Sequence, residues 1–216
     1  MNYKSEFIAF MARSGALTFG DFVTKSGRKT PYFVNTGKYS SGQQIAQLGG
    51  FYANCIMDNV KISENTVLFG PAYKGISLAV STAIALAERG IDVGYCFNRK
   101  EAKDHGEGGS LIGYKPKDGD NIIIIEDVVT AGTAVRESMT LLRAMADVKI
   151  AALYVSVDRM ERGTGEKSTL NELKSEFGIN VYPIINAHDI ISSFPQGDER
   201  IAKMEAYLAE YGGQDG

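Results

Sequence analysis

The stretch NIIIIEDVVTAGTA, residues 121–134, joins a strongly apolar run to two carboxylates and a turn of small residues. Four consecutive isoleucines are typical of a strand that is buried on both faces, as in a parallel sheet. Glu126 and Asp127 follow this run directly, and small residues lead from them into a segment with helical periodicity. The order of strand, acid pair, tight turn and helix predicts a ligand site at the end of a central strand.

Strand-like and helix-like segments alternate along most of the 216 residues, a length that suits one domain with a buried core. We expect strands over residues 66–70, 92–98, 121–128, 149–158 and 180–185, and helices over about 7–14, 42–60, 74–89, 133–145, 168–177 and 198–211. This alternation predicts an α/β fold with a central parallel sheet flanked by helices. Residues 99–120 are rich in charged residues and glycine, and they interrupt this alternation where a helix would be expected.

The composition argues against several classes of protein. Hydrophobic residues make up 44% and charged residues 23% of the chain, which is typical of a globular protein rather than a disordered one. A net charge of -3 argues against a general nucleic-acid-binding role. No apolar stretch approaches the roughly 20 residues that span a bilayer, and the N-terminus lacks the pattern of a signal peptide. Cys55 and Cys96 are predicted to be buried, reduced thiols. We expect a cytoplasmic protein with no membrane or nucleic-acid partner.

The small-residue turn TAGTA, residues 130–134, has the composition of a phosphate-binding loop. Small residues let backbone N–H groups wrap an anion, and a helix N-terminus favours negative charge. Thr130 and Thr133 add hydroxyl donors. Glu126 and Asp127 would repel a phosphate but suit sugar hydroxyls or a divalent cation. A ribose 5-phosphate group satisfies both halves of the stretch.

A structural alternative explains the acid pair as part of a helix N-terminus, where carboxylates favour the positive end of the helix dipole. The alternative accounts for either acid alone, but the full order of strand, acids, small turn and helix favours a ligand site. The stretch is neither a Walker A loop nor a dinucleotide fingerprint, because GxxxxGK[ST] and GxGxxG are both missing from it.

The stretch IIIIEDVVTAGTA resembles the motif with which type I phosphoribosyltransferases bind 5-phosphoribosyl 1-pyrophosphate (PRPP). FGPAYKGISLA (69–79) and FNRKEAKDHGEGGSLIG (97–113) are similar to segments of the orotate phosphoribosyltransferase family, and KSGRKTPYFVNTG (25–37) is similar to its orotate-proximal N-terminal segment. The resemblance runs from about residue 20 to 190. It implies transfer of the phosphoribosyl group of PRPP to orotate in pyrimidine synthesis, with Mg²⁺, by a homodimer.

The resemblance also implies roles for individual residues. Positions matching PRPP contacts of the family are Lys25, Tyr73, Lys74, Arg99, Lys100, Lys103, His105, Glu126, Asp127, Val128, Val129, Thr130, Ala131, Gly132, Thr133 and Ala134. Positions matching orotate contacts are Tyr32, Phe33, Thr130 and Arg159. In the family, Arg99 and its lid neighbours reach into the other subunit's site, and many members have Asp where Glu126 stands.

Residues 99–110 have the composition of a flexible lid. Positive charge comes from Arg99, Lys100, Lys103 and His105, and a hinge is allowed by Gly106, Gly108 and Gly109. Displacing pyrophosphate from an anomeric carbon requires positive charge around the leaving group and the exclusion of water. We expect these four cations to be catalytic, with His105 able to donate a proton to the leaving group. The alternative is a solvated, charged hairpin between residues 111–114 and the preceding strand.

Arg159 follows the strand over 149–158 and would share a sheet edge with Asp127. Its planar guanidinium suits a carboxylate or an imide, and orotate offers both. The alternative is a salt bridge to the neighbouring Asp158 or Glu161.

A small N-terminal hood, residues 1–40, would cover the base with Lys25, Tyr32 and Phe33, although a core role for Phe33 is an alternative. Lys74, in the turn GPAYKG (70–75), would be a second anion contact or, alternatively, a solvent-exposed lysine.

Two other functions compete with orotate transfer. A phosphoribosyltransferase for a purine or uracil would share residues 121–134, whereas the lid and the hood favour orotate. A PRPP-sensing regulator that binds DNA or RNA would need a basic face or a further domain. We expect a single phosphoribosyltransferase domain over 1–216, with no room for a fused decarboxylase. Mg²⁺ would be carried on PRPP near Glu126 and Asp127, and no direct protein ligand is assigned to it.

Overall fold

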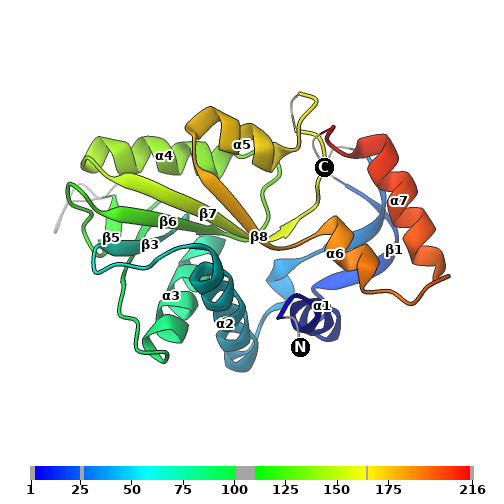
Figure 1. The fold of residues 1–216 in the computed structure, drawn as a ribbon, viewed down its shortest axis with the longest axis horizontal. Helices are drawn as coiled ribbons and strands as arrows, with labels where there is room; N and C mark the ends of the chain where they lie inside the picture. The colour runs from blue at the N-terminus through cyan, green and yellow to red at the C-terminus, as the bar shows by residue number, and fades with distance from the viewer. Residues whose placement is uncertain (1–2, 25–26, 101–109, 164, 215–216) are drawn as a thin grey trace.

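A computed structural model describes residues 3–24, 27–100, 110–163 and 165–214 of the chain (Figure 1). Its main sheet has six strands in the order β5-β4-β3-β6-β7-β8. The strands are β3 (Thr66–Gly70), β4 (Gly94–Asn98), β5 (Leu111–Gly113), β6 (Asn121–Glu126), β7 (Lys149–Asp158) and β8 (Asn180–Asn186). All neighbouring pairs are parallel except β4 and β5. The expected α/β fold with a central, mostly parallel sheet is confirmed.

The four isoleucines of β6 form the centre of the sheet because successive strand residues point to opposite faces. Ile123 and Ile125 belong to the core under helices α1 (Tyr3–Arg13), α2 (Gly42–Asn59) and α3 (Lys74–Ala87). Ile122 and Ile124 belong to a second core under α4 (Thr133–Met145) and α5 (Thr169–Phe177). All four side chains are 0% exposed. The apolar run therefore fixes β6 between two helical layers, which Figure 1 shows above and below the sheet.

The edge strand β5 makes the sheet mixed rather than wholly parallel. It pairs antiparallel with β4, with Phe97 opposite Ile112. The β4–β5 pair thus has the hairpin geometry that was the alternative to a lid, and the segment between the two strands is mostly residues 101–109, outside the described part. A second difference is the short helix α6 (Ala187–Ser192), which follows β8 directly. Its Asn186–Asp189 capping box is a local signal in a stretch too short for periodicity to predict.

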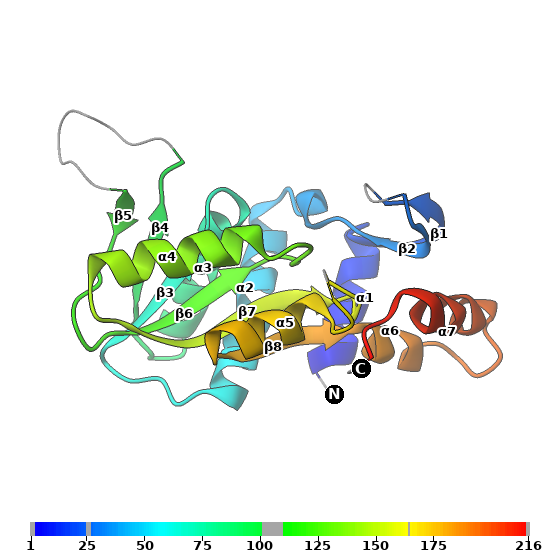
Figure 2. The same cartoon turned by 90° about the horizontal axis from the view of Figure 1, so that it is seen from above.

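The hood consists of more than the N-terminal residues. Strands β1 (Leu17–Val23) and β2 (Lys29–Val34) form a separate antiparallel pair, and the C-terminal helix α7 (Glu199–Tyr211) packs against β2. A single 3-10 turn, η1 (Thr36–Lys38), then leads from β2 toward the main sheet. Figure 2 shows β1, β2 and α7 at the end of the molecule opposite β4 and β5. Helix α1 packs with the main sheet, so residues 1–40 divide between hood and core.

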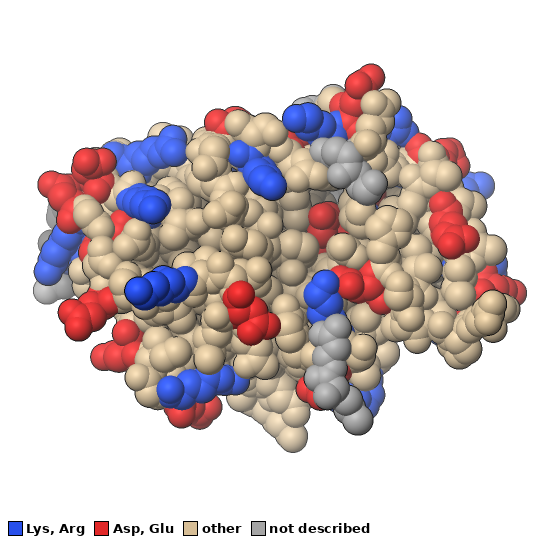
Figure 3. All heavy atoms as spheres, in the orientation of Figure 1, with Lys and Arg blue, Asp and Glu red and all other residues tan. Residues whose placement is uncertain are grey.

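Charges of both signs are interspersed on the face of the molecule in Figure 3. Across the described ranges, no helix is both long and apolar enough to cross a membrane. Cys55 and Cys96 are buried free thiols, as the sequence predicted.

The contact between α2 and α3 depends on the absence of a side chain at Gly49. A Cβ there would overlap the backbone carbonyl of Ser81, whereas a Cβ at Gly50 would come no closer than 3.8 Å to Arg89. We predict that Gly49→Ala destabilises the protein by about 1–3 kcal/mol, because neither helix backbone can move without repacking. The matched control Gly50→Ala should be neutral or stabilising by about 0.5–1 kcal/mol, since alanine is the better helix former. Urea unfolding measures both; equal midpoints for the two variants would contradict this packing.

Candidate active site

The carboxyl ends of the parallel strands β3, β6 and β7 meet along one edge of the sheet. Gly70 ends β3, Glu126 ends β6 and is followed by Asp127, and Arg159 follows the last residue of β7. Ligands of open α/β sheets bind outside such strand ends. The topology therefore brings three of the sequence-predicted segments to one place.

Asp127 is the most strongly bound acid of this edge. Its side chain is buried, and its Oδ2 accepts hydrogen bonds from Lys74 Nζ at 2.6 Å and from Thr36 Oγ1 at 2.6 Å. Burial opposes ionisation, but the hydrogen bonds from Lys74, Thr36 and the Val128 N–H outweigh it and hold the pKa of Asp127 below its usual range. Asp127 is therefore a carboxylate that joins α3 and η1 to the end of β6.

Glu126 is buried beside Asp127 and has the opposite tendency. Burial is the main cause that raises the pKa of Glu126 to about 8, and the charge of Asp127 adds to it. The Glu126 Oε1 accepts the Asp127 N–H at 3.0 Å. The two groups thus divide into an ionised carboxylate and a carboxyl group that holds its proton near neutral pH in the ligand-free protein.

The backbone of the acid pair is fixed by two buried side chains. The Tyr52 hydroxyl donates to the Glu126 carbonyl at 2.7 Å. Ser156 donates to the Asp127 carbonyl from its N–H at 2.8 Å and from its hydroxyl at 2.7 Å. These bonds fix the backbone that carries both carboxyl groups.

The loop between β6 and α4 has the geometry of an anion cradle. Gly132 caps α4 in the left-handed region, with φ 74°. The N–H groups of residues 130–133 have no hydrogen-bond acceptor within the described ranges, and they lie at the favourable end of the α4 dipole. Among the motif residues, Thr130, Ala131 and Thr133 are exposed, whereas Val128, Val129 and Ala134 are half-buried.

Two side chains hold this cradle from outside. The Thr169 hydroxyl, at the start of α5, donates to the Thr130 carbonyl at 2.8 Å. Arg136 Nη1 donates to the Ala131 carbonyl at 2.6 Å, and the same guanidinium binds Glu176 of α5. The carbonyls of the loop are therefore turned outward, which leaves its N–H groups for a ligand.

The turn after β3, which leads to Lys74, follows a tight path close to the end of β4. A Cβ on Gly70 would overlap the carbonyl of Gly75, so both glycines are required for the tight path of the turn. Asn98, at the end of β4, accepts the Ala72 N–H at 2.8 Å. Lys100 lies with its ammonium 6.0 Å from the centre of the Tyr73 ring.

The base of the lid is therefore next to the 70–75 turn. Arg99 continues the β4–β5 pairing through its N–H, which donates to the Ser110 carbonyl at 2.7 Å, and its buried Nε has no hydrogen-bond partner in the described part of the chain. Lys103, His105 and Lys25, the other predicted PRPP contacts, lie outside the described residues.

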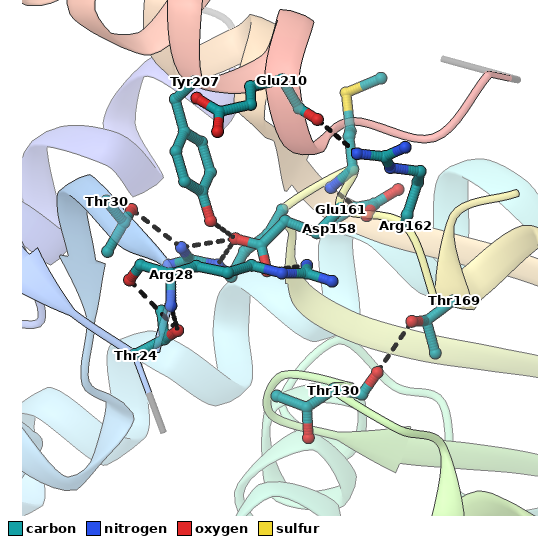
Figure 4. Close-up of polar contacts among 12 residues, drawn as sticks. Thr24, Arg28, Thr30, Thr130, Asp158, Glu161, Arg162, Thr169, Tyr207 and Glu210 are labelled. Atoms are coloured by element: carbon teal, nitrogen blue, oxygen red, sulfur yellow. Dashed lines mark hydrogen bonds and ion pairs between the residues drawn. The ribbon is translucent and has the colours of Figure 1, made fainter. Parts of the chain in front are cut away.

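Arg159 forms a salt bridge to Glu161, which was the alternative to an orotate contact. Its Nε donates to Glu161 Oε1 at 2.7 Å, and Nη2 bonds the same oxygen at 2.6 Å and Thr30 Oγ1 at 3.1 Å. Figure 4 shows Thr30, Glu161 and Tyr207 close together in this part of the site. Burial of Arg159 opposes its charge, yet Tyr32 and Glu161 raise the pKa of its guanidinium.

The two hood aromatics, both expected to cover the base, differ in exposure. Tyr32 is 0% exposed, and its ring lies 4.4 Å from the Arg159 guanidinium carbon. Phe33, for which a core role was the alternative, is 39% exposed. Strand alternation causes this, since neighbouring residues of β2 face opposite sides. Tyr32 thus packs its ring against the Arg159 guanidinium, and Phe33 presents its ring outward.

Several residues of this edge were not predicted. Tyr52 and Ser156 orient the acid pair, Thr36 binds Asp127, and Thr169 and Arg136 brace the cradle. They come from elements distant in sequence, and small hydroxyl residues carry no local signal. Only the strand order brings them together.

Comparisons with known proteins agree with this geometry. Residues 35–182 match the phosphoribosyl transferase domain family. The chain is 50% identical to an orotate phosphoribosyltransferase of Clostridium beijerinckii, over 97% of this chain and 98% of that protein. It is 49% identical to one of Thioalkalivibrio sulfidiphilus, with the same coverage. The solved orotate phosphoribosyltransferase of Francisella tularensis superposes with a TM-score of 0.85 at 35% identity, over 96% of this chain and 99% of that one.

The sheet edge, with its acid pair and anion cradle, defines a type I phosphoribosyltransferase, and the chain is an enzyme of that class. Within the class, it belongs to the orotate phosphoribosyltransferase family, whose reaction turns PRPP and orotate into orotidine 5'-monophosphate and pyrophosphate. The resemblance found in the sequence is confirmed.

The raised pKa of Glu126 predicts a pH dependence of stability. Its carboxyl ordinarily titrates at 4.5 and titrates at about 8 in the fold. Between these values the folded state holds more protons, so stability falls as pH rises through the window, by at most about 1.4 kcal/mol per pH unit. Glu126→Gln keeps an acceptor for the Asp127 N–H and removes this dependence.

Urea unfolding of the ligand-free protein between about pH 5 and pH 9 checks this. The variant should exceed the wild type in stability most at the alkaline end. Asp127 has the opposite sign, but its lowered pKa makes its contribution change only below its ordinary value of 3.8. Parallel pH curves for the two proteins would show that Glu126 titrates normally.

Proposed function

We propose that this chain transfers the phosphoribosyl group of PRPP to orotate, giving orotidine 5'-monophosphate and pyrophosphate for pyrimidine synthesis. The observation that carries the proposal is one sheet edge that offers an acid pair, an anion cradle and a buried arginine. Orotate N1 would lose its proton and form a bond to the anomeric carbon of the ribose, and the bond from that carbon to the pyrophosphate oxygen would break.

PRPP would occupy the edge at the end of β6. The N–H groups and hydroxyls of residues 130–134 would bind the 5-phosphate, and Val128 and Val129 would position that loop. Glu126 and Asp127 would accept or share the protons of the ribose hydroxyls. Because Lys74 is 61% exposed at its side chain while bound to Asp127, it can exchange that carboxylate for the pyrophosphate of PRPP.

Pyrophosphate would leave into a cluster of cations. Tyr73, Lys74, Arg99 and Lys100 lie around the ends of β3 and β4, which supports this role. Lys103 and His105 would complete the cluster from the lid, and His105 would donate a proton to the leaving group. Positive charge fixed at this position stabilises the transition state more than the ground state, because charge develops on the leaving oxygen.

Orotate would bind between the cradle and the hood. Arg159 suits its carboxylate or imide, Thr130 offers a hydroxyl, and the exposed Phe33 ring would lie against the base. Lys25, which lies outside the described residues, would add a positive charge. The buried Tyr32 would act on orotate through Arg159.

The acid pair fits a Mg²⁺ ion that is carried by PRPP. Mg²⁺ takes oxygen ligands and is commonly held by one or two carboxylates together with substrate phosphates. No cluster of three or more metal-binding side chains occurs in the part of the chain that the structure describes. Glu126 and Asp127 would hold the ion together with PRPP, and the ion would neutralise part of the pyrophosphate charge.

We also propose that the enzyme is a homodimer with lid residues acting across the interface. Exposed apolar side chains on neighbouring elements support this: Ile84 of α3 is 56% exposed, and Tyr95 and Ile112 of the β4–β5 pair are 41% and 37% exposed. Tyr95 and Ile112 share a face, because Phe97, two residues after Tyr95, pairs with Ile112. We further propose a single cytoplasmic domain over 1–216 in which residues 99–110 act as the lid.

A panel of bases tests the substrate assignment. With PRPP and Mg²⁺, we predict that the protein consumes orotate, and that uracil, adenine and hypoxanthine are turned over at least about a hundredfold more slowly, because they lack the carboxylate that suits Arg159. Ultraviolet absorbance follows orotate loss, and pyrophosphate release follows the other bases. Turnover of another base without orotate loss would refute the assignment.

A further inference from the structure

Glu161 is the point where three separate parts of the protein meet. Its Oε1 accepts hydrogen bonds from Arg159 Nε at 2.7 Å and from the Tyr207 hydroxyl of α7 at 2.6 Å. Its Oε2 lies 3.7 Å from Arg28 Nη1 of the hood. Figure 4 shows Tyr207 and Arg28 converging on Glu161 from α7 and from the hood.

The contacts hold Arg159 on one edge and one face. Glu161 occupies the Nε and Nη2 edge of the guanidinium, and Thr30 binds Nη2 from the hood. The ring of Tyr32 covers one face at 4.4 Å. A guanidinium constrained in this way keeps one orientation in which it can meet a planar anion.

Helix α7 fixes Glu161 in turn. Tyr207 is 5% exposed, and its ring meets the Tyr32 ring edge to face, with centroids 6.2 Å apart. Beyond α7, the Gly213 N–H donates to the Met160 carbonyl, and the Arg162 N–H donates to the Tyr211 carbonyl, both at 2.9 Å. The C-terminal segment therefore holds the loop that carries both Arg159 and Glu161.

We propose that Glu161 and Tyr207 are positioning residues for Arg159, so that the C-terminal helix sets the affinity of the enzyme for the carboxylated base. The inference rests on the proposed function, because it assigns Arg159 to orotate. It opposes a second interpretation, in which Glu161 only neutralises Arg159 and competes with the substrate carboxylate. The two interpretations predict opposite changes when Glu161 loses its charge.

Steady-state kinetics of Tyr207→Phe and Glu161→Gln separate these interpretations. Phenylalanine keeps the ring contact with Tyr32 and removes only the hydroxyl that holds Oε1. We expect the KM for orotate to rise about threefold to tenfold in each variant, because about 1.4 kcal/mol corresponds to a factor of ten. The KM for PRPP and kcat should stay within about twofold, since the β6 edge is untouched.

The matched control is Tyr211→Phe, which removes a hydroxyl from the same helix that does not bind Glu161, and its constants should equal those of the wild type. Thermal unfolding of all variants reports whether the fold is kept. An orotate KM that is unchanged or lower in Glu161→Gln would overturn the inference, and so would a PRPP KM that rises in parallel. In either case, orotate turnover by the wild type would still uphold the proposed function. Failure of the wild type to use orotate would overturn both.

Discussion

The buried carboxylate of Asp127 is the interaction on which the rest of the site depends. An acid at the end of a central strand, with 8% of its surface exposed, requires partners of opposite charge or hydrogen-bond donors. Lys74 and Thr36 provide them, and this brings the start of α3 and the turn after β2 to the end of β6. One desolvated charge thus joins the start of α3, where pyrophosphate is proposed to bind, to the turn that leads from the hood.

At this edge of the sheet, the groups proposed to bind a ligand differ from the groups that hold them in place. In the proposed site, the groups that would face a ligand are the N–H groups of the loop, the acid pair and the cations of the β3 and β4 ends. The groups that hold them, Thr169, Arg136, Tyr52 and Ser156, bond to carbonyl oxygens on the outer side of the loop and of the acid pair. Glu161 and Tyr207 repeat this arrangement around Arg159. Such outer contacts keep reacting groups in place when the ligand is absent.

Local patterns in the sequence predicted those parts whose structure is decided locally. The helix over 133–145 and the strand over 149–158 have the bounds that periodicity indicates. The strand of the isoleucine run begins at residue 121 as expected but ends at Glu126 rather than at residue 128, and burial on both faces leaves its four isoleucines no competing arrangement. Strand β5 was expected only in the alternative of a hairpin with the preceding strand, since three residues carry no periodicity and pair because β4 is adjacent. The partners of Asp127 and Arg159 also could not be predicted from the sequence, because strand order, rather than spacing along the chain, brings Thr36 and Tyr207 to this region.

The central claim, that the end of β6 binds the phosphoribosyl group, is tested most directly by calorimetric titration of PRPP with Mg²⁺ and without orotate. Gly132→Ala adds a Cβ that meets Arg136 Nη1 at 2.8 Å in the cradle, whereas Gly178→Ala adds one in open space, and both glycines have left-handed backbones. The account predicts that PRPP binding weakens at least about tenfold in Gly132→Ala and stays within about twofold in Gly178→Ala. Equal PRPP affinity of Gly132→Ala and the wild type would contradict it.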